Sequence, residues 1–401
     1  MSEFLQDLTE RLESLRAQDL FRELRRVDSP QGPRIRIDGR ELLNFSSNDY
    51  LGLTGEPALK EAAIRALSEY GTGSGASRLI CGSLAPHHEL EETLAQFKGT
   101  AGALSFSSGY ATALGTIGAL LTRDDVIVVD KLVHACVVDA ARLCGAKLRV
   151  FAHNDLDKLA SILQWADHRK PLTAARARPR LLIVTESVFS MDGDLAPLRE
   201  IVELKDRFGA WLMLDEAHAT GLFGEHRRGL AEAYELADRI EVQMGTLGKA
   251  LGSSGGYICG ARPLIDLLIN RARSFIFSTA PAPAAAAAAT AAVQWVASQA
   301  GDARRRRLWA NVDQIKNGLI AARLPLPLVR SAILPLRVGD ERRAVEQSAA
   351  LRTRGIFIPA IRYPTVARGE ARLRLTATAA HTPEDIQALL GAFTPATLAE
   401  S

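Results

Sequence analysis

Cysteine is scarce in this chain: only 4 of its 401 residues are cysteines, and no two of them form a C-x-x-C pair. Closely spaced cysteine pairs mark zinc ribbons and thioredoxin-like redox motifs, so the sequence predicts neither. Four scattered cysteines in a chain of this length also make a poor disulfide framework. A reducing compartment fits this usage best, and we expect a cytoplasmic protein.

An excess of charge of one sign is absent too. The chain has 49 Lys and Arg against 46 Asp and Glu, a formal net charge of +3. This balance argues against nucleic acid and against an acidic membrane surface as partners. The one local excess is the arginine run 304–307, which we interpret as a solvated helix face. A contact with the phosphates of an acyl-CoA is the alternative interpretation.

Long apolar runs are missing as well. A membrane-spanning helix needs about 20 apolar residues, and only the alanine-rich stretch 281–297 comes near that length. Alanine is a weak membrane residue and two prolines open the stretch, so we predict a helix in water that begins near Pro283. The N-terminal stretch alternates charged residues with leucines and lacks the apolar core of a signal peptide. We therefore expect no membrane association.

Helical patterns alternate along the chain with short apolar runs. The runs lie at 103–106, 126–130, 147–152, 181–187, 211–218 and 242–246. Runs rich in Val, Ile and Leu without polar alternation are typical of strands buried on both faces. Their alternation with helices predicts an α/β domain with a mostly parallel sheet.

The ends of the chain show a different pattern from its middle. Residues 1–27 form an amphipathic pattern, and Asp38-Gly39 predicts a hairpin turn. A long helix is expected over 284–322, followed by alternating strand and helix patterns. We predict an N-terminal helix and hairpin at 1–45, a large α/β domain at 46–288, and a small α+β domain at 289–401.

Ligands bind open α/β sheets outside the carboxyl ends of the strands, so polar residues at strand ends are the candidates. The first is the turn Ser107-Ser108-Gly109-Tyr110, which lies between a strand and a helix that begins near Ala111. Backbone N–H groups at a helix start, with a glycine and hydroxyls beside them, form a natural phosphate site. Serines that merely cap the helix are the alternative.

Other strand ends carry His134, Glu186 and Ser187. A lone histidine such as His134 is more often structural, although its ring could stack on a flat ligand. Asp192 and Asp194 flank a glycine, and we interpret them as turn residues.

Asp215 and His218 form a stronger candidate, because the apolar run WLML leads directly into Asp215. A carboxylate at the end of a strand buried on both faces needs a partner, since an unpaired buried charge is costly. A metal is one option, but two ligands do not make a site and no further cluster has ligand spacing. We expect no metal; a cationic ring nitrogen is the other option.

Lys249 lies in the glycine-rich stretch TLGKALGSSGG, which contains no other charge. A lysine enclosed in a low-dielectric site has a lowered pKa and acts as a nucleophile or base. A phosphate-binding P-loop is excluded, because Ala250 follows the lysine where that motif needs Ser or Thr. A phosphate cradle, a stacking histidine, a buried aspartate and a loop lysine together match pyridoxal phosphate, which is held by a lysine Schiff base and an aspartate.

The chain resembles the α-oxoamine synthase family of pyridoxal-phosphate enzymes, from about residue 45 to residue 381. The stretches that carry the resemblance are SSNDYLGL, ESVFSMDGD, DEAHATGLFG, TLGKALGSSGG and FIFSTAPAP. The resemblance implies the type I, aspartate aminotransferase-like fold: a large domain with a mostly parallel sheet and a smaller α+β C-terminal domain.

The family's roles carry over where these motifs match. Lys249 would bind the cofactor covalently, and Asp215 would keep its ring nitrogen protonated. His218 and Ser187 would lie near its 3-oxygen, and His134 would stack on the ring. The resemblance assigns the cofactor phosphate to Ser108, Gly109, Tyr110 and Thr246.

The remaining implied roles concern the substrates and a second subunit. Thr279 would reach the phosphate of a neighbouring subunit, which implies a homodimer with shared active sites. Arg374 would bind the carboxylate of the amino acid, and Asn48 would line the acyl side of the site.

Within the family, the stretch IRYPTVARGEARLRLTATAAHT is most similar to the branch that condenses L-alanine with a pimeloyl thioester, on CoA or on a carrier protein. That branch makes 8-amino-7-oxononanoate for biotin. Cys136 and Tyr363 depart from the usual residues of this branch, so glycine C-acetyltransferase and 5-aminolevulinate synthase activities remain alternatives. A non-catalytic scaffold is a further alternative, against which the intact set of Lys249, Asp215, His218 and His134 argues.

Overall fold

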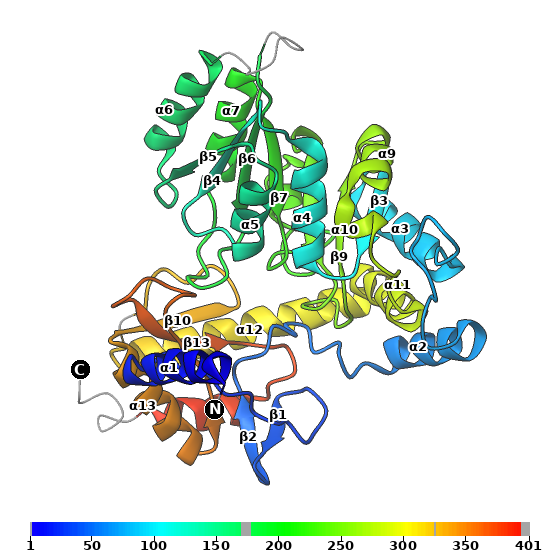
Figure 1. Ribbon diagram of the computed structural model, residues 1–401. Coiled ribbons are helices and arrows are strands. Elements are labelled where there is room, and N and C mark those ends of the chain that lie inside the picture. Colours follow the sequence, from blue (N-terminus) through cyan, green and yellow to red (C-terminus); the bar gives the residue numbers. More distant parts are fainter. Residues whose placement is uncertain (1, 170–177, 325, 394–401) are drawn as a thin grey trace. The chain divides into compact units, whose positions relative to one another are not determined.

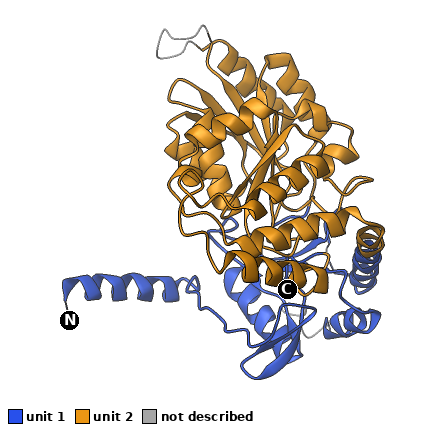
Figure 2. Ribbon diagram, turned by 90° about the vertical axis from the view of Figure 1, so that its right-hand side faces the viewer, with its two compact units in different colours: residues 1–50, 191–193, 307–401 blue, residues 51–190, 194–306 orange. Residues whose placement is uncertain are grey.

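The computed structural model describes residues 2–169, 178–324 and 326–393. The chain divides into two compact units (Figure 2). Unit 1 comprises residues 1–50, 191–193 and 307–401, and unit 2 comprises residues 51–190 and 194–306. Residues 394–401, the end of the C-terminal domain expected from the sequence, lie outside the described residues.

Unit 2 contains a seven-stranded sheet in the order β3-β9-β8-β7-β6-β4-β5 (Figure 1). Its strands are β3 (Gly102–Phe106), β4 (Val126–Asp130), β5 (Lys147–Phe151), β6 (Leu181–Glu186), β7 (Trp211–Asp215), β8 (Val242–Thr246) and β9 (Gly256–Gly260). The neighbours from β8 to β5 pair in parallel, and β9 is antiparallel to β3 and β8. The predicted mostly parallel sheet is confirmed, with β9 as a strand that the sequence pattern did not reveal.

Both faces of this sheet are buried. On one face, alternate residues such as Ile127 and Val184 pack beneath four helices. These are α4 (Gly109–Leu120), α5 (Ala135–Leu143), α9 (Arg262–Arg271) and α10 (Arg273–Ile276). Val128 and Ile183, which point to the other face, are also fully buried. Burial on both faces explains why these strands lack polar alternation.

The other helices of unit 2 complete its layers. They are α2 (Pro57–Tyr70), α3 (Ala85–Lys98), α6 (Leu156–Asp167), α7 (Leu198–Phe208), α8 (Leu230–Ala233), the 3₁₀ turn η1 (Ala237–Arg239) and α11 (Pro283–Ala297). Helix α11 packs on α2 and α3, and α6 packs on α7. No helix in the described part of the chain is long and apolar enough to cross a membrane.

The single helix expected over 284–322 is two helices, α11 and α12 (Gln299–Ala321). Ser298 interrupts them with an extended backbone, at φ −80° and ψ 171°. The Arg227 guanidinium donates to the carbonyls of Val296 and Ala297, at 2.7 and 2.8 Å. These bonds satisfy carbonyls that a helix end otherwise leaves without partners, so a distant arginine makes a break that helical periodicity does not reveal.

The arginine run 304–307 lies near the start of α12. The interpretation of this run as a solvated helix face was wrong for its first two residues. Arg304 donates to the carbonyl of Leu51 at 2.9 Å and pairs with Glu56 at 3.2 Å. Arg305 pairs with Asp302 at 2.7 Å. Both side chains are partly buried, and Arg305 also donates to the carbonyl of Gly224, so the two arginines connect the start of α12 to neighbouring segments of unit 2.

Unit 1 combines the two ends of the chain. Its elements are α1 (Glu3–Ala17), β1 (Arg34–Ile37), β2 (Arg40–Asn44), β10 (Ile333–Gly339), α13 (Glu341–Thr353), β11 (Ile356–Phe357), β12 (Ala360–Ile361), β13 (Ala371–Thr376) and α14 (Pro383–Ala392). The predicted hairpin is confirmed: Asp38 and Gly39 have φ of 52° and 73°, as a two-residue turn between β1 and β2 requires. Helix α1 ends ten residues earlier than its pattern suggested, because Asp19 takes a left-handed backbone conformation.

Candidate active site

Asp215 occupies the last position of β7, at the carboxyl edge of the parallel strands. Its side chain is 6% exposed, and Oδ1 accepts a hydrogen bond from the Ala217 N–H at 2.9 Å. Burial raises the pKa of Asp215, while the positive charge of Lys249 and the Ala217 N–H oppose that shift. A cationic partner for this carboxylate stays a prediction from the sequence.

Lys249 lies in the loop between β8 and β9, with Nζ 2.9 Å from His218 Nε2. The loop is tightly packed: Gly252 has φ of 60°, and a Cβ there would come within 2.7 Å of the backbone of Leu53. The structure thus brings Lys249, His218 and Asp215 together from two strand ends. An amine and an imidazole at this distance can exchange a proton.

Gly109 begins α4, and its backbone touches the end of β8. A Cβ on Gly109 would lie 2.7 Å from Thr246 Cγ2, so only glycine allows this approach. Ser108 caps the helix by accepting from the Ala111 N–H at 3.0 Å. Thr246 Oγ1 is buried and has no hydrogen-bond partner among the described residues. First-turn N–H groups beside an unpartnered hydroxyl are suited to an anion.

Two further residues assigned to the phosphate lie at the surface of unit 2. The Tyr110 hydroxyl donates to the Asp139 carboxylate, which leaves the backbone N–H of Tyr110 as its group for an anion. Thr279 is exposed and forms an isolated antiparallel bridge with Ser77. An exposed Thr279 agrees with the role in a neighbouring subunit that the family resemblance implies.

His134 caps α5, where its Nδ1 accepts from the Cys136 N–H at 3.3 Å. Desolvation lowers the pKa of His134, and Lys249 acts in the same direction while Asp215 opposes it. The ring is therefore neutral near pH 7 yet still accessible, as stacking on a flat ligand requires. Burial raises the pKa of the neighbouring Cys136 to about 12, so its thiol is uncharged.

Ser187 and Glu186 lie one strand away from Asp215. The Ser187 hydroxyl is fully buried and donates to the Asp215 carbonyl at 3.2 Å, which joins the ends of β6 and β7. Glu186 is buried beside them with a carboxyl oxygen that has no partner among the described residues. Sequence reasoning noted Glu186 at a strand end without giving it a role. The available signal was an acidic residue at the end of an apolar run, as at Asp215.

Asn48 and Arg374 meet within unit 1. Arg374 extends from β13, is 5% exposed, and donates from Nη1 to Asn48 Oδ1 at 3.0 Å. The Tyr50 hydroxyl donates to the same Asn48 oxygen at 3.2 Å. The two residues that the resemblance assigned to the substrates are therefore neighbours.

Asp194 is more than the turn residue that its sequence indicated. His153 Nε2 donates to Asp194 at 2.7 Å, and its Nδ1 donates to the buried Asp130 at 3.0 Å. Burial opposes protonation, but these hydrogen bonds raise the pKa of His153 to about 10. Asn154 Nδ2 also donates to Asp194 at 3.1 Å. A charged imidazolium thus links the ends of β4 and β5 to the loop after β6.

This histidine makes unfolding depend on pH. The folded-state pKa of about 10 lies above the unfolded value of about 6.5. The stabilisation is therefore complete below about pH 6.5 and is lost as the pH rises towards 10. Replacing His153 with Gln should remove roughly 2–4 kcal/mol of that pH dependence in urea unfolding. The exposed His226→Gln serves as control, and an unchanged dependence in His153→Gln would refute the assignment.

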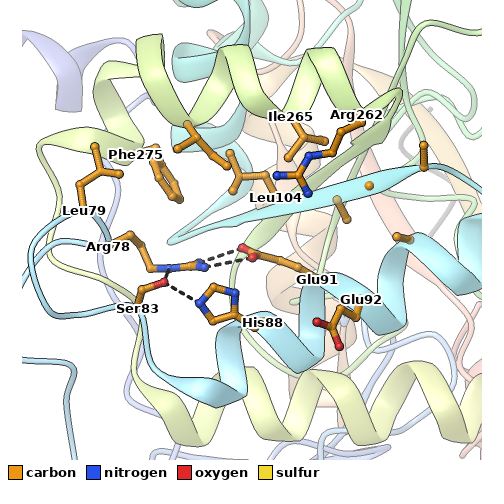
Figure 3. A pocket seen from close by; sticks show the side chains of 15 residues that line it. Arg78, Leu79, Ser83, His88, Glu91, Glu92, Leu104, Arg262, Ile265 and Phe275 are labelled. Atoms are coloured by element: carbon orange, nitrogen blue, oxygen red, sulfur yellow. Dashed lines mark hydrogen bonds and ion pairs between the residues drawn. The ribbon is translucent and has the colours of Figure 1, made fainter.

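Unit 2 also has a separate cavity of about 340 Å³ between α3, α9 and β3 (Figure 3). Arg78 and Glu91 form a bidentate ion pair on the wall of the cavity. Ser83 Oγ lies 2.9 Å from His88 Nε2. Its lining includes no residue that the sequence analysis assigned to the cofactor or the substrates. Within the described residues, no group of three or more His, Cys, Asp or Glu side chains could hold a metal.

Comparison with known proteins places this site in a family. The model of the family "Aminotransferase class I and II" matches residues 40–393. The chain belongs to this family. It is 48% identical over 389 residues to 8-amino-7-oxononanoate synthase of Geotalea daltonii, covering 97% of each chain. It is 49% identical over 382 residues to the enzyme of that name from Anaeromyxobacter sp. Fw109-5, covering 95% of this chain and 93% of the relative.

Solved structures share the fold. A serine palmitoyltransferase from S. paucimobilis matches with a TM-score of 0.90 at 30% identity, covering 98% of this chain and 97% of its own. The 8-amino-7-oxononanoate synthase of Francisella tularensis matches with a TM-score of 0.74 at 27% identity, covering 90% and 98%. The fold class and the family resemblance predicted from the sequence are confirmed.

Proposed function

We propose that this chain is a pyridoxal-5'-phosphate-dependent acyltransferase of biotin synthesis. It condenses L-alanine with a pimeloyl thioester and releases 8-amino-7-oxononanoate, carbon dioxide and the thiol. The observation that carries the proposal is the 2.9 Å contact of Lys249 with His218, beside the buried Asp215. Full-length identity of 44–49% to curated relatives that bear the name 8-amino-7-oxononanoate synthase supports the choice of substrates.

The residues present fit the cofactor. The unpartnered Thr246 hydroxyl and the first N–H groups of α4 suit a phosphate. The buried Asp215 suits a protonated ring nitrogen, and Lys249 suits the aldehyde. When bound, pyridoxal phosphate supplies an electron sink for the carbanion formed at the amino acid's α-carbon.

The protein's part in the chemistry is to position the reactants and move protons. Lys249 Nζ takes the α-proton of alanine and returns a proton after decarboxylation. His218, 2.9 Å away, accepts or donates a proton at Nζ. With the cofactor bound, an ionised Asp215 would hold its ring nitrogen protonated, and the neutral His134 ring would stack on it.

Substrate recognition falls to a different set of side chains. Arg374 binds the alanine carboxylate, because a planar guanidinium is the preferred partner of a carboxylate. Its bond to the Asn48 side chain at 3.0 Å fixes the guanidinium, and Asn48 itself lines the acyl side.

Serine palmitoyltransferase activity is the main alternative function, since structures of that enzyme match this chain with TM-scores up to 0.90. That match reflects a shared backbone, at an identity of only 30%. The curated 8-amino-7-oxononanoate synthases are more similar in sequence, and side chains rather than backbone decide specificity. We therefore favour alanine and pimeloyl over serine and palmitoyl.

Thiol release from pairs of substrates tests this choice. The protein is supplied with L-alanine, glycine or L-serine, each together with a pimeloyl, acetyl, succinyl or palmitoyl thioester. We expect fastest release with L-alanine and the pimeloyl thioester, on either CoA or a carrier protein. Glycine with acetyl-CoA or with succinyl-CoA would instead indicate glycine C-acetyltransferase or 5-aminolevulinate synthase. Release no faster than in Lys249→Ala would indicate a scaffold.

We also propose a cytoplasmic homodimer with shared active sites. The exposed Thr279 supports a contribution to a neighbouring subunit, and the four free cysteines support a reducing location. Sedimentation equilibrium should give twice the chain mass. Thr279→Val should weaken cofactor binding in the dimer, and a fully active monomer would contradict the proposal.

A further inference from the structure

Glu186 is a buried acid at the proposed cofactor site that has no assigned role. It ends β6, which lies beside the parallel strand β7 (Figure 1). The Cα of Glu186 pairs with that of Asp215 on β7. Side chains paired across parallel strands point to the same face of the sheet. Glu186 is 3% exposed and Asp215 is 6% exposed, so two carboxyl groups are buried side by side.

The two oxygens of Glu186 have different surroundings. Oε2 accepts from the Ser190 N–H at 3.2 Å, and the backbone of His134 also donates to the carboxyl group. Oε1 is buried and has no hydrogen-bond partner among the described residues. Because an unpartnered buried polar atom costs about 1–3 kcal/mol, such an atom beside a ligand site indicates a partner supplied by the ligand.

The charges around Glu186 favour its neutral form. Burial and the neighbouring Asp215 raise the pKa of Glu186 to about 8, against the opposing charge of Lys249. The Cys136 thiol also interacts with Glu186, and its pKa of about 12 leaves it uncharged. Asp215 is the better anion of the pair: at Asp215 the favourable charge of Lys249 outweighs the charge of Glu216, whereas at Glu186 the charge of Asp215 outweighs that of Lys249.

We propose that Glu186 is a positioning residue that works as a neutral carboxylic acid. Its Oε2 holds the loop after β6, its carboxyl group accepts from the backbone of His134, and its Oε1 hydroxyl donates a hydrogen bond to the cofactor or the substrate bound on it. The site thereby has one anion, Asp215, and one neutral donor, Glu186. This inference rests on the proposed function in so far as it names the cofactor as the ligand.

Ionisation of Glu186 removes this donor and puts a second negative charge beside Asp215. The proton goes to solvent, and no other reactant is needed. Cofactor affinity should therefore fall as the pH rises through the titration of Glu186. A Gln side chain keeps a neutral donor of the same length and cannot ionise, whereas Ala keeps neither contact.

Cofactor binding separates these variants. The dissociation constant of pyridoxal phosphate is measured for wild type, Glu186→Gln and Glu186→Ala between about pH 6 and pH 10. Wild type should lose about ten-fold in affinity above pH 8 that Glu186→Gln does not lose. Glu186→Ala should bind about ten-fold more weakly than Glu186→Gln at every pH. Equal losses in Gln and Ala at pH 7 would overturn the proposal, because they would show that the carboxylate itself is needed.

A second measurement does not depend on the cofactor. Between the unfolded pKa of about 4.3 and the folded value of about 8, folded Glu186 holds a proton that the unfolded chain has lost. The free energy of unfolding of the apoprotein should therefore fall as the pH rises through that window, and Glu186→Gln should abolish this fall. If the unfolding free energy of wild type and of Glu186→Gln depended on pH in the same way, the neutral carboxyl group would be refuted. If wild type showed this pH dependence of unfolding but did not bind pyridoxal phosphate, the proposed function would be refuted instead.

Discussion

Lys249→Ala should abolish the reaction and the covalent attachment of the cofactor together. The wild-type amine lies 2.9 Å from His218 and near the buried Asp215, and Ala leaves no group that can form the imine or take the α-proton. Loss of a group with both roles lowers kcat on the order of 10⁴-fold or more. Thiol release measures the rate, and borohydride reduction followed by peptide mass analysis locates the attachment.

The matched control is Lys316→Ala, which removes a lysine paired with Asp313 on α12. This variant should turn over at the wild-type rate, and the cofactor should still be attached to Lys249. Attachment of the cofactor to any other lysine, or turnover in Lys249→Ala close to wild type, would show that the catalytic centre is misassigned.

Asp215→Asn should have the second largest effect and a different signature. Asn keeps the shape and can still accept from the Ala217 N–H, but it has no charge to hold a proton on the ring nitrogen. We expect kcat to fall on the order of 10³-fold, because the charge acts where electrons accumulate in the transition state. The attachment to Lys249 should persist, as the absorbance of the bound cofactor would report.

Asp206→Asn is the control for a lost carboxylate, since Asp206 pairs with Arg239 at the surface. It should leave kcat unchanged. A loss smaller than about ten-fold in Asp215→Asn would mean that the ring nitrogen does not depend on this charge. Release of the cofactor by Asp215→Asn would mean that the residue acts in binding instead.

Much of the site could be predicted because its residues follow apolar strands. The runs that end at Asp215 and Thr246 are continuous, so the carboxyl ends of these strands could be located from the sequence. The residues just beyond them then became candidates for the site. The neighbouring Glu186 was harder to interpret. Its role depends on a register that pairs it with Asp215 and on an oxygen without a partner, and neither is encoded in spacing along the chain.

Other features depend on contacts between distant segments. Strand β9 has glycines at both ends: Gly256 leaves room for the backbone of Gly109, and Gly245 on β8 leaves room for the side chain of Tyr257. The break between α11 and α12 needs Arg227, about 70 residues earlier, to bind the free carbonyls. The linkage of His153 to Asp130 and Asp194 likewise joins the ends of β4 and β5 to the loop after β6, across 23 and 41 positions of the chain.

The most direct test of the central claim uses L-alanine labelled at its carboxyl carbon together with a pimeloyl thioester. The account predicts that labelled carbon dioxide and free thiol appear in equal amounts and that the product has the mass of 8-amino-7-oxononanoate. Both releases should be absent in Lys249→Ala. Thiol release without labelled carbon dioxide, or a product that keeps the label, would contradict a decarboxylative condensation at this site.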